Sequence, residues 1–508
     1  MVHSKACDQR SALMGEPICI ICGRYGQYIC DWTEKDVCSL ECRDICRNRF
    51  ASERMDASAK NKVHDIRSNN RISVKGEDVP PPIASFDSLS TQIAENLNTL
   101  NCIIPTPVQM QAIPAIMTGK HTVFSAATDE GKTLAYLLPI VTQILDHREA
   151  FPDETGPLSV IIAPSRELCI QIESCAKSIM KNIPRMKTAL LMGGLPLPSQ
   201  LYRLECGVEM IIATPGRFLE IFSETENGNW EALLHNVLSI AVDEVDKMLE
   251  ASFCDQVVEI VTLLSKGSNR SESLQFIACT ATVSPFLEQA IDALLHSFFG
   301  HSDKLWIHVD AATVNDKCVH SIRPRVMWTK VHEKKHLLFE FLEARPKEST
   351  LVFVASRAGA DMLTDSITKK CSQMEARSVH GGKTQLERLA IMEAFTTRQV
   401  QVLVATLVLA RGIHLSRLDN VLLFDLPQNI TDYIHQIGRL RNRNCEKKRS
   451  AIIFVCNEDK KLIPELLSLW NQHKITFPKH LVRKYGSRPT KAQIKRLSSR
   501  PPDRNRSA

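Results

Sequence analysis

The stretch HTVFSAATDEGKTLAYLL (121–138) decides the fold, because it combines a strand, a phosphate-binding loop and the start of a helix. Its loop, AATDEGKT (126–133), follows the apolar run and precedes the helical one. In such a loop, successive backbone N–H groups and the helix N-terminus surround a phosphate. Lys132 would reach the β- and γ-phosphates of a nucleotide, and the Thr133 hydroxyl would bind Mg²⁺. Taken alone, Gly131-Lys132-Thr133 fits an ordinary helix start equally well.

A pair of carboxylates supports the nucleotide interpretation. The run LSIAVDEVD (238–246) predicts a second buried strand that ends at Asp243 and Glu244. Asp243 would hold Mg²⁺, and Glu244 would orient a water molecule for in-line attack on a phosphate. The alternative is two solvated acidic residues at a strand end. The distance along the chain from the loop to this pair, about one subdomain, suits the chemistry.

Similar short runs, rich in Val, Ile and Leu, recur along the chain and are nearly continuous rather than alternating. This pattern is typical of strands buried on both faces of a parallel sheet. Helical stretches between the runs predict repeated βαβ units, and therefore two doubly wound α/β domains whose ligand sites lie at the carboxyl ends of the strands. The runs cover 121–126, 158–164, 210–215, 238–244 and 274–282, and then 350–356, 400–406, 420–427 and 451–456.

Composition and charge limit the class of protein. A chain of 508 residues implies several domains, and 44% apolar with 24% charged residues is ordinary for folded protein. The net charge of +6 is mild, but ten Lys and Arg against one acidic residue lie between Lys479 and the end. This composition predicts a solvated basic tail with non-specific phosphate affinity. No run approaches the roughly 18 apolar residues that span a bilayer, and the polar start is unlike a signal peptide, so we expect an intracellular protein without a membrane partner.

The cysteines are unevenly distributed, and six of the 17 fall between Cys19 and Cys46. Two close pairs, Cys19-x2-Cys22 and Cys38-x3-Cys42, would each supply two thiolates to a tetrahedral Zn²⁺. Disulfides are the alternative, but the ten cysteines scattered beyond residue 100 suit a reducing compartment and favour metal. Because so short a segment has too small an apolar core to fold alone, the metal would supply the folding energy.

The ordered set of motifs resembles the DEAD-box RNA helicases over about residues 84–478. One such motif would be weak support, whereas a collinear series across two lobes is specific. The resemblance implies two tandem RecA-like domains. Besides the loop and the carboxylates, the series comprises Phe86 with Gln109, PSREL (164–168), Gly193-Gly194, TPGR (214–217), Thr280-Ala281-Thr282, Gln385 with Arg388, ATLVLARG (405–412) and HQIGR (435–439).

The resemblance implies a role for each position. Residues expected to contact ATP and Mg²⁺ are Phe86, Gln109, Ala126, Ala127, Thr128, Asp129, Glu130, Gly131, Lys132, Thr133, Asp243 and Glu244. Those expected to contact RNA, through its backbone and with little sequence preference, are Pro164, Arg166, Gly193, Gly194, Thr214, Gly216, Arg217, Gln385, Arg388 and Thr406. Those expected to couple the ATP state to unwinding are Asp246, Thr280, Thr282 and His435. The catalytic set would be Lys132, Asp243, Glu244 and Arg439.

Four positions depart from the family pattern. Asp129 replaces a glycine of the phosphate loop, Leu407 and His414 replace aspartates, and Asn442 replaces the final arginine of the last motif. Aspartate tolerates unusual backbone angles, but a carboxylate about 4 Å from a phosphate costs on the order of 1–4 kcal/mol. Two hypotheses follow: a working ATP-dependent RNA helicase that unwinds RNA duplexes locally or remodels RNA–protein complexes, or a helicase-shaped scaffold with little turnover that binds RNA and proteins. The retained catalytic set favours the enzyme.

The cysteine cluster resembles a HIT-type zinc finger, which a subset of these helicases carries at the N-terminus. Cys30 and Cys46 match half of a second zinc site, which is incomplete because Thr33 and Phe50 stand at its other ligand positions. The resemblance implies protein docking by the finger, with direct RNA contact as the alternative, and a nuclear location. The complete first site comprises Cys19, Cys22, Cys38 and Cys42.

These features divide the chain into six parts. They are a flexible N-terminus (1–16), the HIT-type zinc finger (17–50), a polar linker (51–83), an ATP-binding RecA-like domain (84–308), a C-terminal RecA-like domain (309–478) and a disordered basic tail (479–508).

Overall fold

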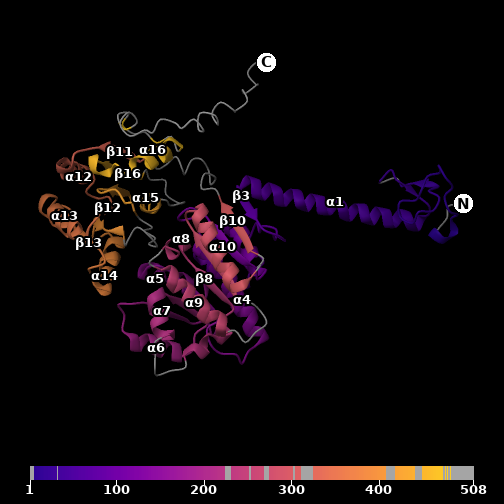
Figure 1. Cartoon of the computed structure of the whole chain (residues 1–508), viewed down its shortest axis with the longest axis horizontal. Helices are drawn as coiled ribbons and strands as arrows, with labels where there is room; N and C mark the ends of the chain where they lie inside the picture. The colour runs from indigo at the N-terminus through magenta and orange to yellow at the C-terminus, as the bar shows by residue number, and fades with distance from the viewer. Residues whose placement is uncertain are drawn as a thin grey trace, which may run out of the picture. The chain divides into compact units, whose positions relative to one another are not determined.

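The computed structural model forms two compact units, Met1–Arg71 and Ile72–Ala508 (Figure 1). Side chains are not described for 47–60, 230–232 and 266–267. The structure describes residues 5–30, 33–223, 230–250, 253–267, 274–300, 304–309, 324–407, 418–440, 449–472, 475, 478 and 481.

The N-terminal unit is a small finger followed by a long helix. Two short strands pair antiparallel, and α1 begins where the Ser39 side chain accepts a hydrogen bond from the Cys42 N–H, as expected for a serine N-cap. The elements are η1 (Ala6–Asp8), β1 (Tyr28–Ile29), β2 (Asp36–Val37) and α1 (Leu40–Asn69).

Residues 5–16, within the stretch predicted to be flexible, make defined contacts in the finger. Ser11 bridges to Arg24, and the Arg24 side chain donates to the Gln9 carbonyl oxygen at 2.7 Å. Arg10 forms an ion pair with Glu16 at 2.6 Å. These contacts give the polar segment partners within the finger, which its composition alone does not reveal.

The first lobe is built on an eight-stranded sheet in the order β3-β10-β4-β9-β8-β5-β7-β6. All neighbours are parallel except β3 and β10. The strands are β3 (Ile72–Lys75), β4 (His121–Ser125), β5 (Ser159–Ile162), β6 (Thr188–Leu191), β7 (Met210–Ala213), β8 (Ser239–Val242), β9 (Gln275–Thr280) and β10 (Lys304–Val309).

Helices cover both faces of this sheet and give two separate hydrophobic clusters. One cluster joins the sheet to α3, α4 and α5, and the other joins it to α7, α9 and α10. The helices are α2 (Thr91–Thr99), α3 (Pro107–Met117), α4 (Lys132–Ala150), α5 (Arg166–Ile179), α6 (Leu197–Glu205), α7 (Pro215–Phe222), η2 (Trp230–Asn236), α8 (Val245–Met248), α9 (Cys254–Gly267) and α10 (Pro285–Phe299).

The second lobe repeats this plan with a six-stranded parallel sheet in the order β11-β16-β15-β12-β14-β13. Its strands are β11 (Arg325–Trp328), β12 (Thr350–Phe353), β13 (Ala376–Val379), β14 (Val402–Ala405), β15 (Asn420–Leu423) and β16 (Ser450–Val455). Its helices are η3 (Val331–Glu333), α12 (Lys334–Glu343), α13 (Arg357–Lys370), α14 (Gln385–Thr396), α15 (Ile430–Gly438), η5 (Asn457–Asp459) and α16 (Ile463–Gln472).

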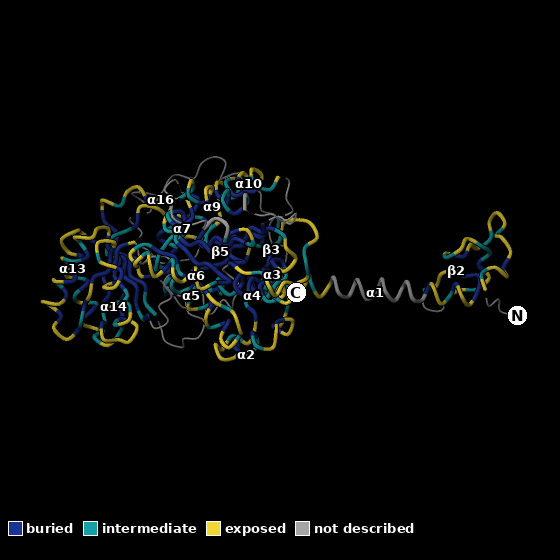
Figure 2. The backbone as a smooth tube through the Cα atoms, turned by 90° about the horizontal axis from the view of Figure 1, so that it is seen from below, coloured by how far each residue is buried: buried dark blue, intermediate teal, exposed yellow. Residues whose placement is uncertain are grey.

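The two doubly wound sheets confirm the predicted fold class, and all nine predicted runs form strands. Central strands such as β5 are buried along their whole length, as their continuous apolar sequences require (Figure 2). Within the described residues, no helix has the length and apolar character needed to cross a membrane.

The expectation of a linker over 51–83 is wrong for most of its length. Residues 51–69 continue α1, and β3 pairs with β10 at the edge of the first sheet. The proline run is held against α3 by two hydrogen bonds. The Gln111 side-chain amide donates to the Pro80 carbonyl oxygen at 2.9 Å, and the Ile83 N–H donates to the Met110 carbonyl oxygen at 2.8 Å. The polar composition of 51–69 fits a solvated helix as well as a linker, and β3 is an edge strand with an alternating burial pattern.

Candidate functional site

The phosphate loop lies between β4 and α4, where the sequence predicts it. Asp129 and Gly131 both adopt left-handed backbone angles, with φ of 67° and 78°. The Lys132 ammonium folds back and donates to the carbonyl oxygens of Ala126 and Ala127 at 2.8 and 2.9 Å. Burial lowers the pKa of Lys132, and the nearby carboxyl groups partly oppose that shift. The loop therefore encloses the half-buried Lys132 ammonium at the N-terminus of a 19-residue helix, a suitable site for an anion.

Gln109 supports this loop from α3. Its side-chain oxygen accepts from the Thr106 N–H at 2.9 Å, and its amide donates to the Gly131 carbonyl oxygen at 3.0 Å. A Cβ at Gly131 would lie 2.4 Å from the Gln109 amide nitrogen, so the contact requires glycine. Phe86 is buried. Gln109, which is expected to contact ATP, thus lies directly against the phosphate loop.

Asp243 and Glu244 follow β8, as predicted, and both are buried. Asp243 accepts hydrogen bonds from the Glu244 N–H at 2.8 Å, the Tyr136 hydroxyl at 3.0 Å and the Cys279 thiol at 2.9 Å. Burial raises the pKa of Glu244 and, together with Asp243, holds the pKa of Tyr136 and Cys279 well above their usual values. Arg439 opposes the shift at Glu244, so its charge acts on this site.

A chain of hydrogen bonds links the site to the second lobe. The Thr280 hydroxyl donates to the Thr282 carbonyl oxygen at 2.8 Å, and the Thr282 hydroxyl donates to Asp246 Oδ2 at 3.0 Å. His435 Nε2 lies 3.3 Å from the same oxygen, and the His435 side chain is fully buried. Nearby, the Thr128 hydroxyl donates to the Gly438 carbonyl oxygen at 3.2 Å. The four predicted coupling residues therefore form one connected network.

The predicted RNA residues of the first lobe gather at one edge of the sheet. Pro164, Gly193 and Thr214 follow the carboxyl ends of β5, β6 and β7, which are parallel neighbours. The Arg166 guanidinium lies against the Gly193 and Gly194 backbone, where an added Cβ would lie 3.0 and 2.4 Å from it. Gly216 is exposed, Arg217 pairs with Glu220 at 2.8 Å, and Thr406 follows β14 in the second lobe and is buried.

Gln385 and Arg388 take a partner that sequence reasoning did not identify. The Gln385 amide donates to Glu167 Oε1 at 3.2 Å, and Arg388 forms an ion pair with the same carboxylate. All three side chains are buried. Glu167 lies within the PSREL motif, directly after Arg166. Its place in that motif is the sequence feature from which its role could have been predicted.

Of the four positions that depart from the family pattern, two are among the residues that the structure describes and two are not. Asp129 keeps the left-handed geometry expected of the glycine it replaces. Leu407 is 39% exposed. His414 and Asn442 lie outside the described residues. So does the predicted basic tail (479–508), except for Leu481.

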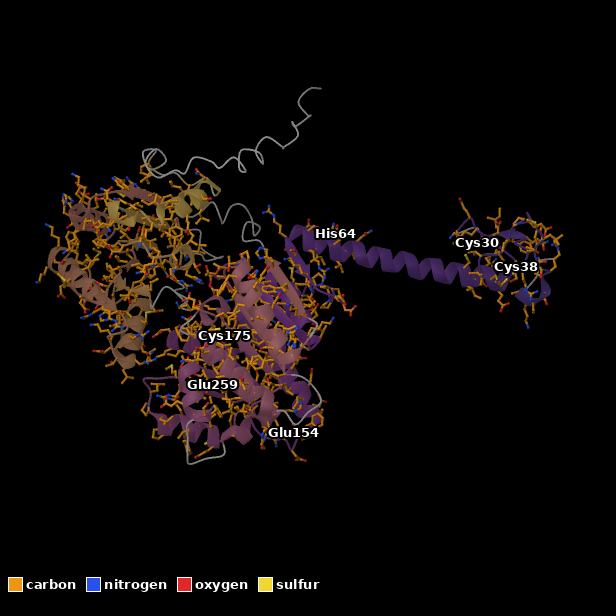
Figure 3. The ribbon with its side chains drawn as sticks, viewed as in Figure 1. Cys30, Cys38, His64, Glu154, Cys175 and Glu259 are labelled. Carbon is orange, nitrogen blue, oxygen red and sulfur yellow. The ribbon has the colours of Figure 1, made fainter. Side chains whose placement is uncertain are left out.

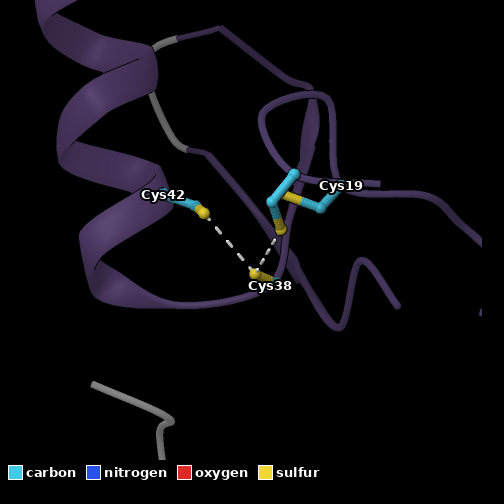
Figure 4. Close-up of side chains that lie close together, drawn as sticks. Cys19, Cys38 and Cys42 are labelled. Carbon is cyan, nitrogen blue, oxygen red and sulfur yellow. Dashed lines mark hydrogen bonds between the residues drawn. The ribbon is translucent and has the colours of Figure 1, made fainter. Parts of the chain in front are cut away.

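The first predicted zinc site is assembled in the finger. The Sγ atoms of Cys19, Cys22, Cys38 and Cys42 all lie within 4.8 Å of one another. Cys38 Sγ lies 3.4 Å from Cys22 Sγ. It lies 3.6 Å from Cys42 Sγ, as Figure 4 shows by a dashed line. Four converging thiols suit tetrahedral Zn²⁺, because this ion prefers sulfur ligands in closed four-coordinate sites.

The half-site contains a hydroxyl where a further ligand is expected. Cys30 and Cys46 are buried, and Cys46 Sγ lies 3.3 Å from the Thr33 hydroxyl. Cys30 and Cys38 are labelled together in the finger in Figure 3. Among the described residues, the first cluster alone brings three or more metal-binding side chains together.

Comparisons with known proteins match each part of the chain. Three protein-family models match: DEAD/DEAH box helicase over residues 106–290, helicase conserved C-terminal domain over 333–443 and HIT zinc finger over 15–44. DEAD-box ATP-dependent RNA helicase 41 of Arabidopsis thaliana is 37% identical over 95% of this chain and 94% of its own length. The probable ATP-dependent RNA helicase DDX59 of Homo sapiens is 36% identical over 91% of this chain and 75% of its own.

Solved structures share the fold. Mss116p bound to single-stranded RNA and AMP-PNP matches with a TM-score of 0.67 at 21% identity, over 83% of this chain and 86% of that one. Dbp5 of S. cerevisiae bound to RNA and ADP BeF3 matches with a TM-score of 0.64 at 22% identity, over 80% of this chain and all of that one (100%).

Proposed function

Because the chain belongs to the DEAD-box ATP-dependent RNA helicases, in the subfamily with a HIT zinc finger, we propose that it uses Mg²⁺ and ATP to separate short RNA duplexes locally. The observation that carries this proposal is the network of Thr282, Asp246 and His435, which ties the nucleotide site to the second lobe. A change at the phosphates thereby reaches both lobes that would grip the RNA.

The residues present suit the nucleotide and its metal. The loop N–H groups and Lys132 would bind the phosphates, while Thr133 and Asp243 would hold Mg²⁺, which supplies charge neutralisation when bound. Glu244 would orient the attacking water, and its raised pKa favours a carboxyl group able to take up the proton. Arg439 would face the charge that develops in the transition state.

RNA contacts at the carboxyl ends of β5, β6 and β7 would be made mainly to phosphates. Phosphate contacts position a strand without reading its bases, so we expect little sequence preference. The 2′-hydroxyl is the group that would let the site prefer RNA over DNA.

The finger is proposed to hold one Zn²⁺ and to dock a protein partner. Large apolar side chains are exposed on this small unit, among them Leu13, Met14 and Ile29 at 68%, 107% and 69% exposure. Exposed apolar groups of this size favour a protein surface over an RNA backbone as the partner. A nuclear location is proposed from the basic composition of residues 479–508.

Strand separation tests the proposal directly. We expect a short RNA duplex to be separated with ATP and Mg²⁺, and to remain paired with a non-hydrolysable analogue under multiple-turnover conditions. A DNA duplex of the same sequence is the matched control. Tight RNA binding without strand separation would instead support the helicase-shaped scaffold.

A further inference from the structure

Asp243 is enclosed by three hydrogen-bond donors from three different elements. Its Oδ1 accepts from the Glu244 N–H at 2.8 Å and the Cys279 thiol at 2.9 Å, and its Oδ2 accepts from the Tyr136 hydroxyl at 3.0 Å. The side chains of Asp243, Cys279 and Tyr136 are at most 4% exposed, so water does not compete strongly for these bonds.

The donors use up most of the acceptor capacity of the carboxylate. An ionised carboxylate offers about four lone-pair sites, two on each oxygen. The two donors at Oδ1 saturate that atom, and Tyr136 takes one of the two sites at Oδ2. The remaining site for a metal ion, or for water bound to it, is therefore on Oδ2, and the Tyr136 hydroxyl fixes which way it points.

The placement of the donors connects them to residues with other roles in the site. Tyr136 lies on α4 three residues after Thr133, so both face the same side of the helix. Cys279 lies on β9 directly before Thr280, and β9 pairs with β8, which leads into Asp243. Tyr136 therefore connects Asp243 to the phosphate loop, and Cys279 connects Asp243 to the coupling network.

We propose that Tyr136 and Cys279 are positioning residues that orient Asp243 for Mg²⁺ and set the affinity of the site for that ion. The proposal rests on the proposed function, because it concerns the metal that accompanies the nucleotide. Outer partners that orient a metal ligand typically change metal affinity by about 10–100-fold when removed.

A purely structural role would give a different result. A buried hydroxyl or thiol needs a partner whatever the function, so its loss would lower the stability of the fold without changing the dependence on Mg²⁺. The free Mg²⁺ concentration at half-maximal binding of a fluorescent ADP separates the two roles, because it reports the metal site without requiring turnover.

The experiment uses the full chain and four variants. Tyr136→Phe and Cys279→Ala each remove one donor, and we expect each to raise the half-saturating Mg²⁺ concentration about tenfold, with ADP binding without Mg²⁺ unchanged. Cys279→Ser keeps a donor and should remain within about threefold of the wild type. Tyr433→Phe is the matched control, since its hydroxyl accepts from Trp470 at 3.0 Å in the core of the second lobe.

Two outcomes overturn the proposal: one rules out the positioning role alone, and the other also rules out the proposed use of Mg²⁺. If Tyr136→Phe and Cys279→Ala lower the unfolding midpoint as Tyr433→Phe does but leave the Mg²⁺ dependence at the wild-type value, the positioning role is wrong and the proposed function stands. If the wild type binds ADP with no dependence on Mg²⁺, both the positioning role and the proposed use of Mg²⁺ fail.

Discussion

Asp129 shows how a single substitution preserves a shape while changing a charge. Its φ of 67° lies in the left-handed region, which glycine adopts freely and aspartate tolerates better than most residues. The loop around it retains the inward-folded Lys132 ammonium and the left-handed Gly131. The departure therefore affects the electrostatics of phosphate binding more than the path of the backbone.

Removing that charge should strengthen nucleotide binding. We expect Asp129→Asn, which keeps the tolerance for left-handed angles, to increase the affinity for Mg²⁺-ATP about tenfold, because a like charge near a phosphate costs on the order of 1–4 kcal/mol. Equilibrium titration with a fluorescent ATP analogue measures it. Asp129→Ala is the control for backbone strain, which costs about 1–2 kcal/mol, and should bind more weakly than Asp129→Asn. Unchanged or weaker binding by Asp129→Asn would contradict a repulsive role.

At the scale of elements, the strands that escaped prediction share a position. Within the two lobes, four of the five described strands that were not predicted, β3, β6, β11 and β13, are the outer strands of the sheets, and β10 lies next to one edge. Several carry polar or alternating residues, as in ARSV of β13, because one side of an edge strand lacks a neighbour. The continuous apolar runs that identified the central strands are absent from β3 (ISVK) and β13 (ARSV).

The candidate site was predictable where chemistry depends on short motifs. Lys132, Asp243 and the coupling residues lie in such motifs, and the structure brings them together. Glu167, Tyr136 and Cys279 were not predicted, because their roles depend on neighbours at separations of 36 to 218 residues along the chain. Only the folded sheets reveal those pairings.

Strand β4 contains a histidine that should make stability depend on pH. Burial lowers the pKa of His121 to about 4, from 6.5. Its Nδ1 accepts from the Phe276 N–H at 2.9 Å. Between these two pKa values the unfolded chain binds the additional proton, so stability falls as the pH drops from about 6.5 towards 4 and the loss levels off below that.

Urea unfolding at pH 7.5 and pH 5 measures this effect. We expect the wild type to lose about 2 kcal/mol more than His121→Asn between the two pH values. Asparagine can accept the same hydrogen bond without titrating in this range. An equal loss in both proteins would show that His121 does not titrate as its burial implies.

The coupling network predicts a selective defect. Thr282→Val removes the hydrogen bond to Asp246 and leaves a buried carboxylate oxygen with one partner fewer, a change of about 1–3 kcal/mol. We expect the stimulation of ATP hydrolysis by RNA to fall about tenfold while ATP affinity stays at the wild-type value. Thr262→Val, on the outer side of α9, is the matched control. A parallel loss of ATP affinity would instead indicate general damage to the first lobe.

At the scale of the whole molecule, the chain divides into a finger unit and a motor unit. The finger has one four-thiol cluster, while Thr33 occupies a position in the incomplete half-site. We expect elemental analysis to find about one zinc per chain. A zinc-selective chelator, added with Mg²⁺ in excess, should unfold the finger and leave RNA-stimulated ATP hydrolysis largely intact, because the motor has its own hydrophobic cores. Two zinc ions per chain would contradict this account of the half-site.

Phosphate release from ATP, measured with and without saturating RNA in the wild type and in Lys132→Ala, shows whether the chain is a working motor. A working motor predicts release that RNA stimulates and that Lys132→Ala loses, since the Lys132 ammonium is the cation of the phosphate loop. Release no greater than that of Lys132→Ala, with RNA binding intact, would contradict the claim and identify the chain as a scaffold.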